Sequence, residues 1–146
     1  MLVRDLMSAE VVTLGREETL DIADRIMNLG RIRHMPVVDD EGRLCGLVSQ
    51  RDLFRGALAS ALGMAAAAQS RLLGALLVRE VMAADPITTT PDTPLGEAAA
   101  IMLRRKIGCL PVVEGERLVG IITEADFVAH VAALSAADST TPPGSG

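Results

Sequence analysis

Short runs of β-branched and other apolar residues alternate along the chain with stretches whose apolar residues recur at helical spacing. The short runs are bounded by polar, proline or glycine residues, which predicts strands at residues 11–14, 35–38, 44–49, 87–90, 110–113 and 118–123. The acidic, glycine-containing segments at 39–43 and 114–117 predict turns that join the later strands into two hairpins. A helix is expected directly after each hairpin, beginning near Arg51 and near Glu124.

Two further helices are predicted between the first strand and the hairpin of each set. In the first, Leu20, Ala23, Ile26 and Met27 share one helical face. Thr19 is the expected N-cap of this helix and Gly30 its expected stop. In the second, we expect Thr93 to be the cap and Pro94 to take the first helical position, where its missing N–H costs nothing.

The segments 3–53 and 78–127 repeat one another. The lead-in Val-Arg-Asp-Leu-Met at residue 3 returns as Val-Arg-Glu-Val-Met at residue 78, and both lead-ins are predicted to be short helices. The offset between the copies changes by one residue in the hairpin turn and holds elsewhere. Because a unit of about 50 residues buries too little surface to be stable alone, we expect the two copies to share a core and to form a pair of clefts between them.

The repeat predicts the domain organisation. We expect an α+β fold with one copy at residues 1–56, a helical linker at 57–77, the second copy at 78–133 and a disordered tail at 134–146. The linker is rich in alanine and leucine, so it either contacts another subunit or lies against its own domain. Both alternatives are open at this stage.

Composition excludes several functional classes. A net charge of −5 and only two aromatic residues argue against a nucleic-acid surface. The most apolar stretch, residues 57–68, is shorter than the roughly 18 residues of a membrane span. Two cysteines and two histidines at scattered positions predict neither a metal site nor a catalytic centre. With no secretory signal at the N-terminus, we expect a cytoplasmic protein with reduced thiols.

The repeated motifs resemble a pair of CBS domains, the Bateman module. The residues that carry the resemblance are the Asp-Leu-Met lead-in, the Pro-Val-Val strands at 36–38 and 111–113, and the Gly-x-x-Ser/Thr-x-x-Asp segments at 46–52 and 120–126. The resemblance implies a stand-alone regulatory protein with two tandem β-α-β-β-α repeats packed with pseudo-two-fold symmetry. It also implies a homodimer that binds AMP, ADP, ATP or S-adenosylmethionine between the repeats and signals to a downstream protein.

Asp52 and Asp126 are the candidate ribose ligands. A carboxylate accepts two hydroxyl hydrogen bonds at once, and both aspartates follow Ser49 and Thr123 where a strand leads into a helix, a place that favours anions. The alternative is that Ser/Thr-x-x-Asp is only a capping box. Gly46 and Gly120 favour the ligand interpretation, because glycine lets a ligand approach the backbone. The sequence leaves open whether the base rests on the same copy as the aspartate.

The remaining ligand-binding residues are assigned to the base and the phosphate. An adenine slot without aromatic side chains needs aliphatic walls, for which the candidates are Val11, Val12, Pro36, Val37, Val48, Pro86, Ile87, Pro111, Val112 and Ile122. Most of these are expected to be core residues whether or not they also contact a ligand. Thr13 and Thr88 either add a hydroxyl or simply suit a strand. The resemblance assigns phosphate to Arg33 and His34, with Arg31 and Arg51 nearby in sequence. The alternative is that Arg31 and Arg33 form a solvated edge that balances nearby acidic residues.

An adenine-nucleotide sensor is therefore the leading functional hypothesis, and no catalytic residue is predicted. The alternative is a structural dimerisation module with degenerate pockets. The second copy supports that alternative, since Gly108, Cys109 and Ala125 stand where the first copy has Arg33, His34 and Arg51.

Overall fold

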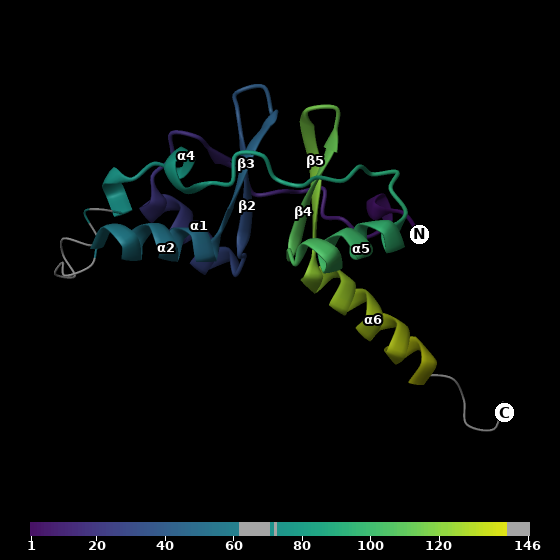
Figure 1. Ribbon diagram of the computed structural model, residues 1–146. Coiled ribbons are helices and arrows are strands. Elements are labelled where there is room, and N and C mark those ends of the chain that lie inside the picture. Colours follow the sequence, from purple (N-terminus) through teal and green to yellow (C-terminus); the bar gives the residue numbers. More distant parts are fainter. Residues whose placement is uncertain (62–70, 72, 140–146) are drawn as a thin grey trace.

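The computed structural model describes residues 1–61, 71 and 73–139. In chain order its elements are η1 (Val3–Asp5), β1 (Leu14–Gly15), α1 (Leu20–Gly30), β2 (His34–Val38), β3 (Leu44–Ser49), α2 (Gln50–Ala61), α4 (Val78–Val81), α5 (Leu95–Arg105), β4 (Cys109–Glu114), β5 (Arg117–Thr123) and α6 (Glu124–Ser139). Two hairpins stand side by side, with α1 and α2 beside one and α5 and α6 beside the other (Figure 1). The α+β class and the tandem repeat are thereby confirmed.

Each copy is built on an antiparallel hairpin. β2 pairs with β3 and β4 pairs with β5, with a register irregularity at Val37/Val38 and at the equivalent Val112/Val113. The turns of the two hairpins also meet, because the Leu44 N–H donates to the Glu116 carbonyl over 2.9 Å and the Leu118 N–H donates to the Gly42 carbonyl over 3.2 Å. This contact supports the pseudo-two-fold arrangement of the copies.

The first strands are shorter than predicted. β1 contains only Leu14 and Gly15, which pair in parallel with Val37 and Val38 of β2. In the second copy a single bridge, Thr89 to Val112, replaces the strand expected at 87–90. Most of each predicted strand therefore lies outside the sheet.

The ends of two helices differ from the prediction by one residue. α1 ends at Gly30, but the left-handed residue that terminates it is Arg31, with φ of 53°. In the second copy the equivalent residue is Lys106, with φ of 55°. The N-cap of α5 is Pro94, and the expected cap, Thr93, instead bonds its hydroxyl to that of Thr90.

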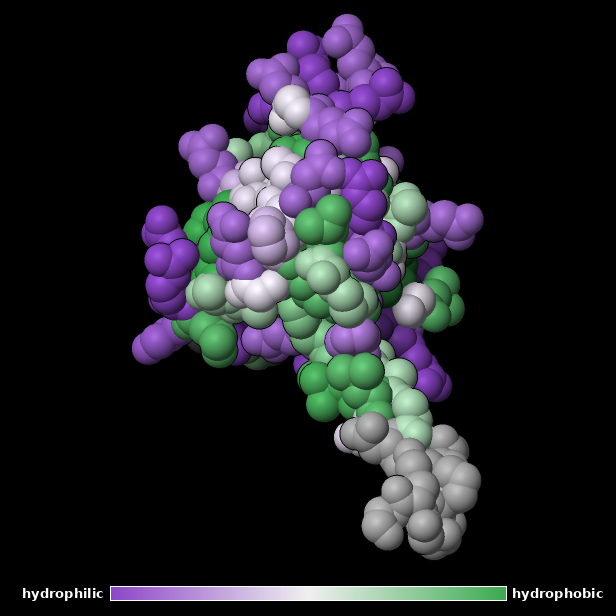
Figure 2. Space-filling model, turned by 90° about the vertical axis from the view of Figure 1, so that its right-hand side faces the viewer, coloured by the Kyte–Doolittle hydropathy of each residue, from purple (hydrophilic) through white to green (hydrophobic). Residues whose placement is uncertain are grey.

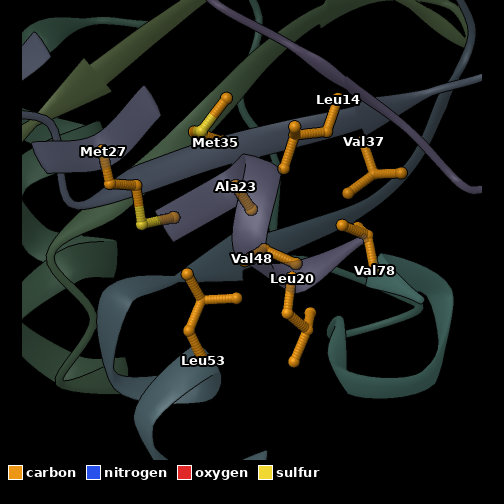
Figure 3. Close-up of a cluster of buried hydrophobic side chains, with 9 residues drawn as sticks. All are labelled: Leu14, Leu20, Ala23, Met27, Met35, Val37, Val48, Leu53 and Val78. Carbon is orange, nitrogen blue, oxygen red and sulfur yellow. The ribbon is translucent and has the colours of Figure 1, made fainter. Parts of the chain in front are cut away.

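The lead-in segments exchange between the copies. Val78, at the start of the second copy, is fully buried in the first core with Leu20 and Val48, and Figure 3 shows it among these side chains. Val3, at the start of the first copy, is fully buried in the second core with Leu110. Each structural core therefore contains a segment of the other sequence repeat.

The exchange explains the two glycines of the repeated strand motif. A β-carbon on Gly46 would lie 2.5 Å from Met82 Sδ and 2.8 Å from the Ala83 carbonyl oxygen. A β-carbon on Gly120 would meet the Met7 sulfur at 2.7 Å. These glycines admit the lead-in of the other copy, so the expectation that they admit a ligand is wrong.

The linker and tail are only partly described. Leu73 and Leu76 pack against the first core, which fits a linker laid against its own domain, and residues 62–70 and 72 lie outside the described part. α6 continues to Ser139, so residues 134–139 are helical rather than disordered, and residues 140–146 lie outside the described part. In the part of the chain that is described, no helix combines the length and apolar character required to cross a membrane.

Candidate functional site

Two clefts of similar size lie along the seam between the copies. One, the Asp52 cleft, has a volume of about 690 Å³. It is lined by residues 33–34, 47 and 49–52 of the first copy and by residues 83, 85–87, 106–109 and 124 of the second. The other, the Asp126 cleft, has a volume of about 730 Å³ and is lined by residues 8, 10–12 and 31–34 of the first copy and by residues 108, 121, 123–126 and 128 of the second. Each cleft is therefore built from both copies.

The carboxylate of Asp52 caps the N-terminus of α2, and the residue also lines the Asp52 cleft. Its Oδ2 accepts the Ser49 N–H over 2.8 Å, and its own N–H donates to Ser49 Oγ over 3.1 Å. This reciprocal pair is the capping box that the alternative interpretation predicted. The same residue lines the Asp52 cleft, so capping and cleft position occur together.

Asp126 is held less symmetrically. Its Oδ2 accepts the Thr123 N–H over 2.8 Å and the Thr123 hydroxyl over 3.3 Å. In neither aspartate does Oδ1 accept a hydrogen bond from residues that the structure describes. Both side chains are half-buried. One carboxylate oxygen therefore caps the helix while the other stays available to a hydroxyl in the cleft.

The cations of the sequence are distributed over both clefts. Arg51 and Lys106 line the Asp52 cleft, although they come from different copies. Arg31 lines the Asp126 cleft, and Arg33 lines both clefts. The cation-rich first copy therefore does not create one cation-rich cleft, because its arginines are divided between the two clefts and Lys106 of the second copy lines the Asp52 cleft.

His34 lies at the seam and lines both clefts. Burial lowers the pKa of its imidazole below the usual value of 6.5, and the charge of Arg33 acts in the same direction. The nearby carboxylates of Asp52 and Glu124 oppose this shift. The net direction is downward, so His34 is neutral at pH 7 and can accept or donate a hydrogen bond without bringing a charge.

Glu124 is a cleft residue that the sequence analysis missed. It is the first residue of α6 and lines both clefts. The signal available was its position directly after Thr123, which corresponds to Gln50 after Ser49, a residue that also lines a cleft. Sequence alone could not show that it reaches across the seam.

The other predicted residues fall into three places. Ile87 lines the Asp52 cleft together with Pro86, and Val11 and Val12 line the Asp126 cleft, so these are the aliphatic walls. The remaining wall candidates are fully buried core residues: Pro36, Val37, Val48, Pro111, Val112 and Ile122. Thr88 lines a separate hollow of about 440 Å³ near the hairpin turns, and Thr13 is exposed outside the clefts described above. The predicted site therefore divides into a cleft set, a core set and two threonines that belong to neither.

Thiol and metal chemistry find no support in the described residues. Both cysteines are free, and burial, with the charge of Asp126, raises the pKa of the Cys109 thiol to about 12. Such a thiol is not ionised at neutral pH and is therefore a poor nucleophile. No group of three or more potential metal ligands occurs among the residues searched in the described part of the chain.

The chain resembles known proteins over most of its length. The family model for the CBS domain matches residues 3–58 and 78–133. A CBS domain-containing protein of Dictyostelium discoideum is 33% identical, with 88% of this chain and 89% of that protein covered. In a relative from Methanocaldococcus jannaschii, 32% identical, the match covers 86% of this chain but only 41% of the relative.

Three solved structures share the fold. A proposed acetoin utilization protein (AcuB) from Vibrio cholerae has a TM-score of 0.79 and 38% identity, with 98% of each chain covered. The CBS domain pair of MJ0100, in complex with 5′-methylthioadenosine and S-adenosyl-L-methionine, has a TM-score of 0.74 and 28% identity over 90% of this chain and 99% of that one. CBSX2 in complex with AMP has a TM-score of 0.75 and 26% identity over 92% and 98%. The sequence repeat, the paired hairpins and these matches together show that the chain belongs to the CBS domain family as a CBS-domain pair.

Proposed function

We propose that this protein is a regulatory module that binds an adenosine derivative, namely AMP, ADP, ATP or S-adenosylmethionine, in the clefts between its copies. The observation that carries the proposal is the pair of clefts between the copies, each lined by an aspartate at a strand-to-helix junction and by at least two cations. The related pairs solved with AMP and with S-adenosyl-L-methionine support the ligand class. No catalytic step and no cofactor are part of the proposal.

Each part of the ligand has a proposed partner in the Asp52 cleft. The free oxygen of Asp52 accepts the ribose hydroxyls, Pro86 and Ile87 of the other copy flank the base, and Arg51 and Lys106 neutralise the phosphate. In the Asp126 cleft, Asp126, Val12 and Arg31 take the same roles. A ligand that touches both copies binds one relative orientation of them better than another, and this differential affinity shifts the equilibrium that a partner detects.

Calorimetric titration with each of the four adenosine derivatives tests the proposal. Binding is expected at sub-millimolar ligand, and replacing Asp52 or Asp126 with alanine is expected to remove one cleft at a time. Glu80→Ala is the matched control, because Glu80 accepts the Leu77 N–H over 2.8 Å in the same capping pattern but lies outside both clefts. Absence of binding heat with all four ligands would reject this function.

A homodimer is proposed as the assembly that transmits the signal. Phe54 and Leu58 on α2 are at least half exposed, as are Val128, Val131 and Leu134 on α6. Figure 2 shows hydrophobic residues gathered toward the C-terminal end of the chain, which Figure 1 places at the end of α6. A second copy would remove these apolar surfaces from water. The two free thiols fit a reducing cytoplasmic compartment.

The alternative function is a dimerisation module with degenerate pockets. The acidic residues favour it, since Glu124 lines both clefts and Asp85 and Glu10 add one carboxylate to each. A dimer that binds none of the four adenosine derivatives would establish this alternative instead.

A further inference from the structure

Arg33 has no counterpart with a side chain in the second copy. Its side chain lines both of them, while the equivalent position in the second copy is Gly108, which has no side chain to offer. The copies thus provide one guanidinium at this position where full symmetry would provide two.

The backbone at Arg33 is anchored at the seam. Its carbonyl accepts the Gln50 N–H over 2.8 Å, and the Gly108 carbonyl accepts the Glu124 N–H over 3.0 Å in the equivalent bond. The Arg33 side chain is exposed, and no ion pair with another described residue holds its guanidinium. The side chain can therefore turn toward either cleft while its backbone stays in place.

We propose that the two clefts compete for Arg33, so that a phosphate-bearing ligand in one cleft weakens the binding of a second one in the other. This inference rests on the proposed function. A guanidinium makes its paired, charge-assisted hydrogen bonds to one phosphate at a time. The first ligand recruits Arg33, and the second binds without it. Because coupling is reciprocal, the weakening is the same whichever cleft fills first.

Titration with AMP measures the coupling. Asp52→Ala and Asp126→Ala each leave one cleft, so each variant gives one association constant for AMP. In the wild type, the product of the two stepwise association constants is expected to be about tenfold below the product of those two single-cleft constants. The factor corresponds to the loss of one charge-assisted hydrogen bond. In the Arg33→Met background the two products are expected to be equal. Arg33→Met is also expected to weaken both single-cleft variants, because each isolated cleft recruits the guanidinium.

Two arginines supply matched controls. Arg31 lines only the Asp126 cleft of the two, and Arg51 lines only the Asp52 cleft. Arg31→Met and Arg51→Met should each weaken one cleft and leave the tenfold discrepancy between the products unchanged. If Arg33→Met behaves like these controls, Arg33 serves a single cleft and the coupling is overturned.

Gly108→Arg is an independent test that leaves both carboxylates in place. A β-carbon at Gly108 would lie 3.5 Å from the Glu124 carboxyl group and 3.7 Å from His34 Cε1, which are ordinary contacts. A second guanidinium is expected to tighten binding of the second AMP about tenfold, with the first little changed. Unchanged second binding contradicts the competition while the proposed function stands. No binding of AMP, ADP or ATP by the wild type contradicts the competition, and no binding of any of the four adenosine derivatives rejects the proposed function as well.

Discussion

At the scale of single residues, Thr89 is a polar group in an apolar place. It is 5% exposed, and its hydroxyl has no hydrogen-bond partner within the described residues. The equivalent residue of the first copy is Leu14, which belongs to the first core. The hydroxyl therefore loses its hydration on folding without a replacement bond.

Thr89→Val is expected to stabilise the protein by about 1 kcal/mol, because valine keeps the shape and removes the unsatisfied hydroxyl. Chemical denaturation measures the change in the free energy of unfolding. Thr88→Val is the control, since Thr88 is only half-buried and its substitution should change stability by less than about 0.5 kcal/mol. A destabilised Thr89→Val variant would show that the hydroxyl is bonded in solution.

His34 gives the protein a pH dependence of known sign. Its pKa is lowered in the folded state by burial, so the unfolded chain takes up the proton first as the pH falls below about 6.5. Stability from this residue is complete above that pH and is lost as the pH falls toward the folded pKa. Arg33, Asp52 and Glu124 are the charged groups around it.

The free energy of unfolding is therefore expected to decrease as the pH falls below about 6.5, and His34→Gln is expected to reduce that slope. Denaturation at a series of pH values, in wild type and variant, measures the difference. An identical slope in both proteins would mean that other groups cause the dependence in this range.

At the scale of elements, the contact between each lead-in and the opposite hairpin explains why glycine occupies positions 46 and 120. The Leu47 N–H donates to the Ala83 carbonyl over 3.0 Å, and the Ala83 N–H donates to the Leu47 carbonyl over 2.9 Å. Ser8 and Ile121 make the same reciprocal pair, at 2.9 and 3.0 Å. These bonds bring the backbone after each lead-in helix close to the opposite hairpin. Only glycine then fits at position 46 beside Met82 and at position 120 beside Met7.

Gly46→Ala is expected to destabilise the protein by about 1–3 kcal/mol, because the added methyl group overlaps the Ala83 carbonyl and Met82 Sδ. Gly96→Ala in α5 is the control, since nothing lies within 4 Å of its β-carbon. That variant should be stabilised by about 0.5–1 kcal/mol. Thermal unfolding of both variants checks the contrast, and a neutral Gly46→Ala would refute the steric account.

At the scale of the whole molecule, α2 and α6 carry exposed apolar side chains, on which the proposed dimer rests. Five large apolar side chains on these helices are at least half exposed, which is a substantial cost for a monomer. The proposed dimer removes that cost by burying them between copies.

Val131→Glu combined with Leu134→Glu is expected to convert the proposed dimer to a monomer, because burial of two carboxylates in an apolar interface is strongly unfavourable. Light scattering during gel filtration measures the mass. Leu29→Glu is the matched control, since Leu29 is 81% exposed on α1, and it should leave the mass unchanged. A wild type that already elutes as a monomer would contradict the proposed assembly.

The two cores show how far sequence reasoning reaches. The hairpins, the helical stripe beginning at Leu20 and the two aspartates at strand-to-helix junctions were predicted correctly in position, because periodicity and capping are local properties. The domain boundary was harder, because Val3 and Val78 pack in the core of the opposite copy and nothing in a repeat indicates which copy a segment joins.

The sequence by itself determined the duplicated unit, its hairpins and the carboxylates at the helix starts. Only the tertiary structure decided that Gly46 packs against the backbone at Ala83, that Pro36 and Ile122 are core residues outside the two cleft linings, and that Glu124 and Arg33 line both clefts. The physical reason is the separation along the chain of the residues that interact. Hydrogen-bonding and hydropathy patterns act between residues close in the chain, whereas a cleft is formed by segments brought together when the two copies pack against each other.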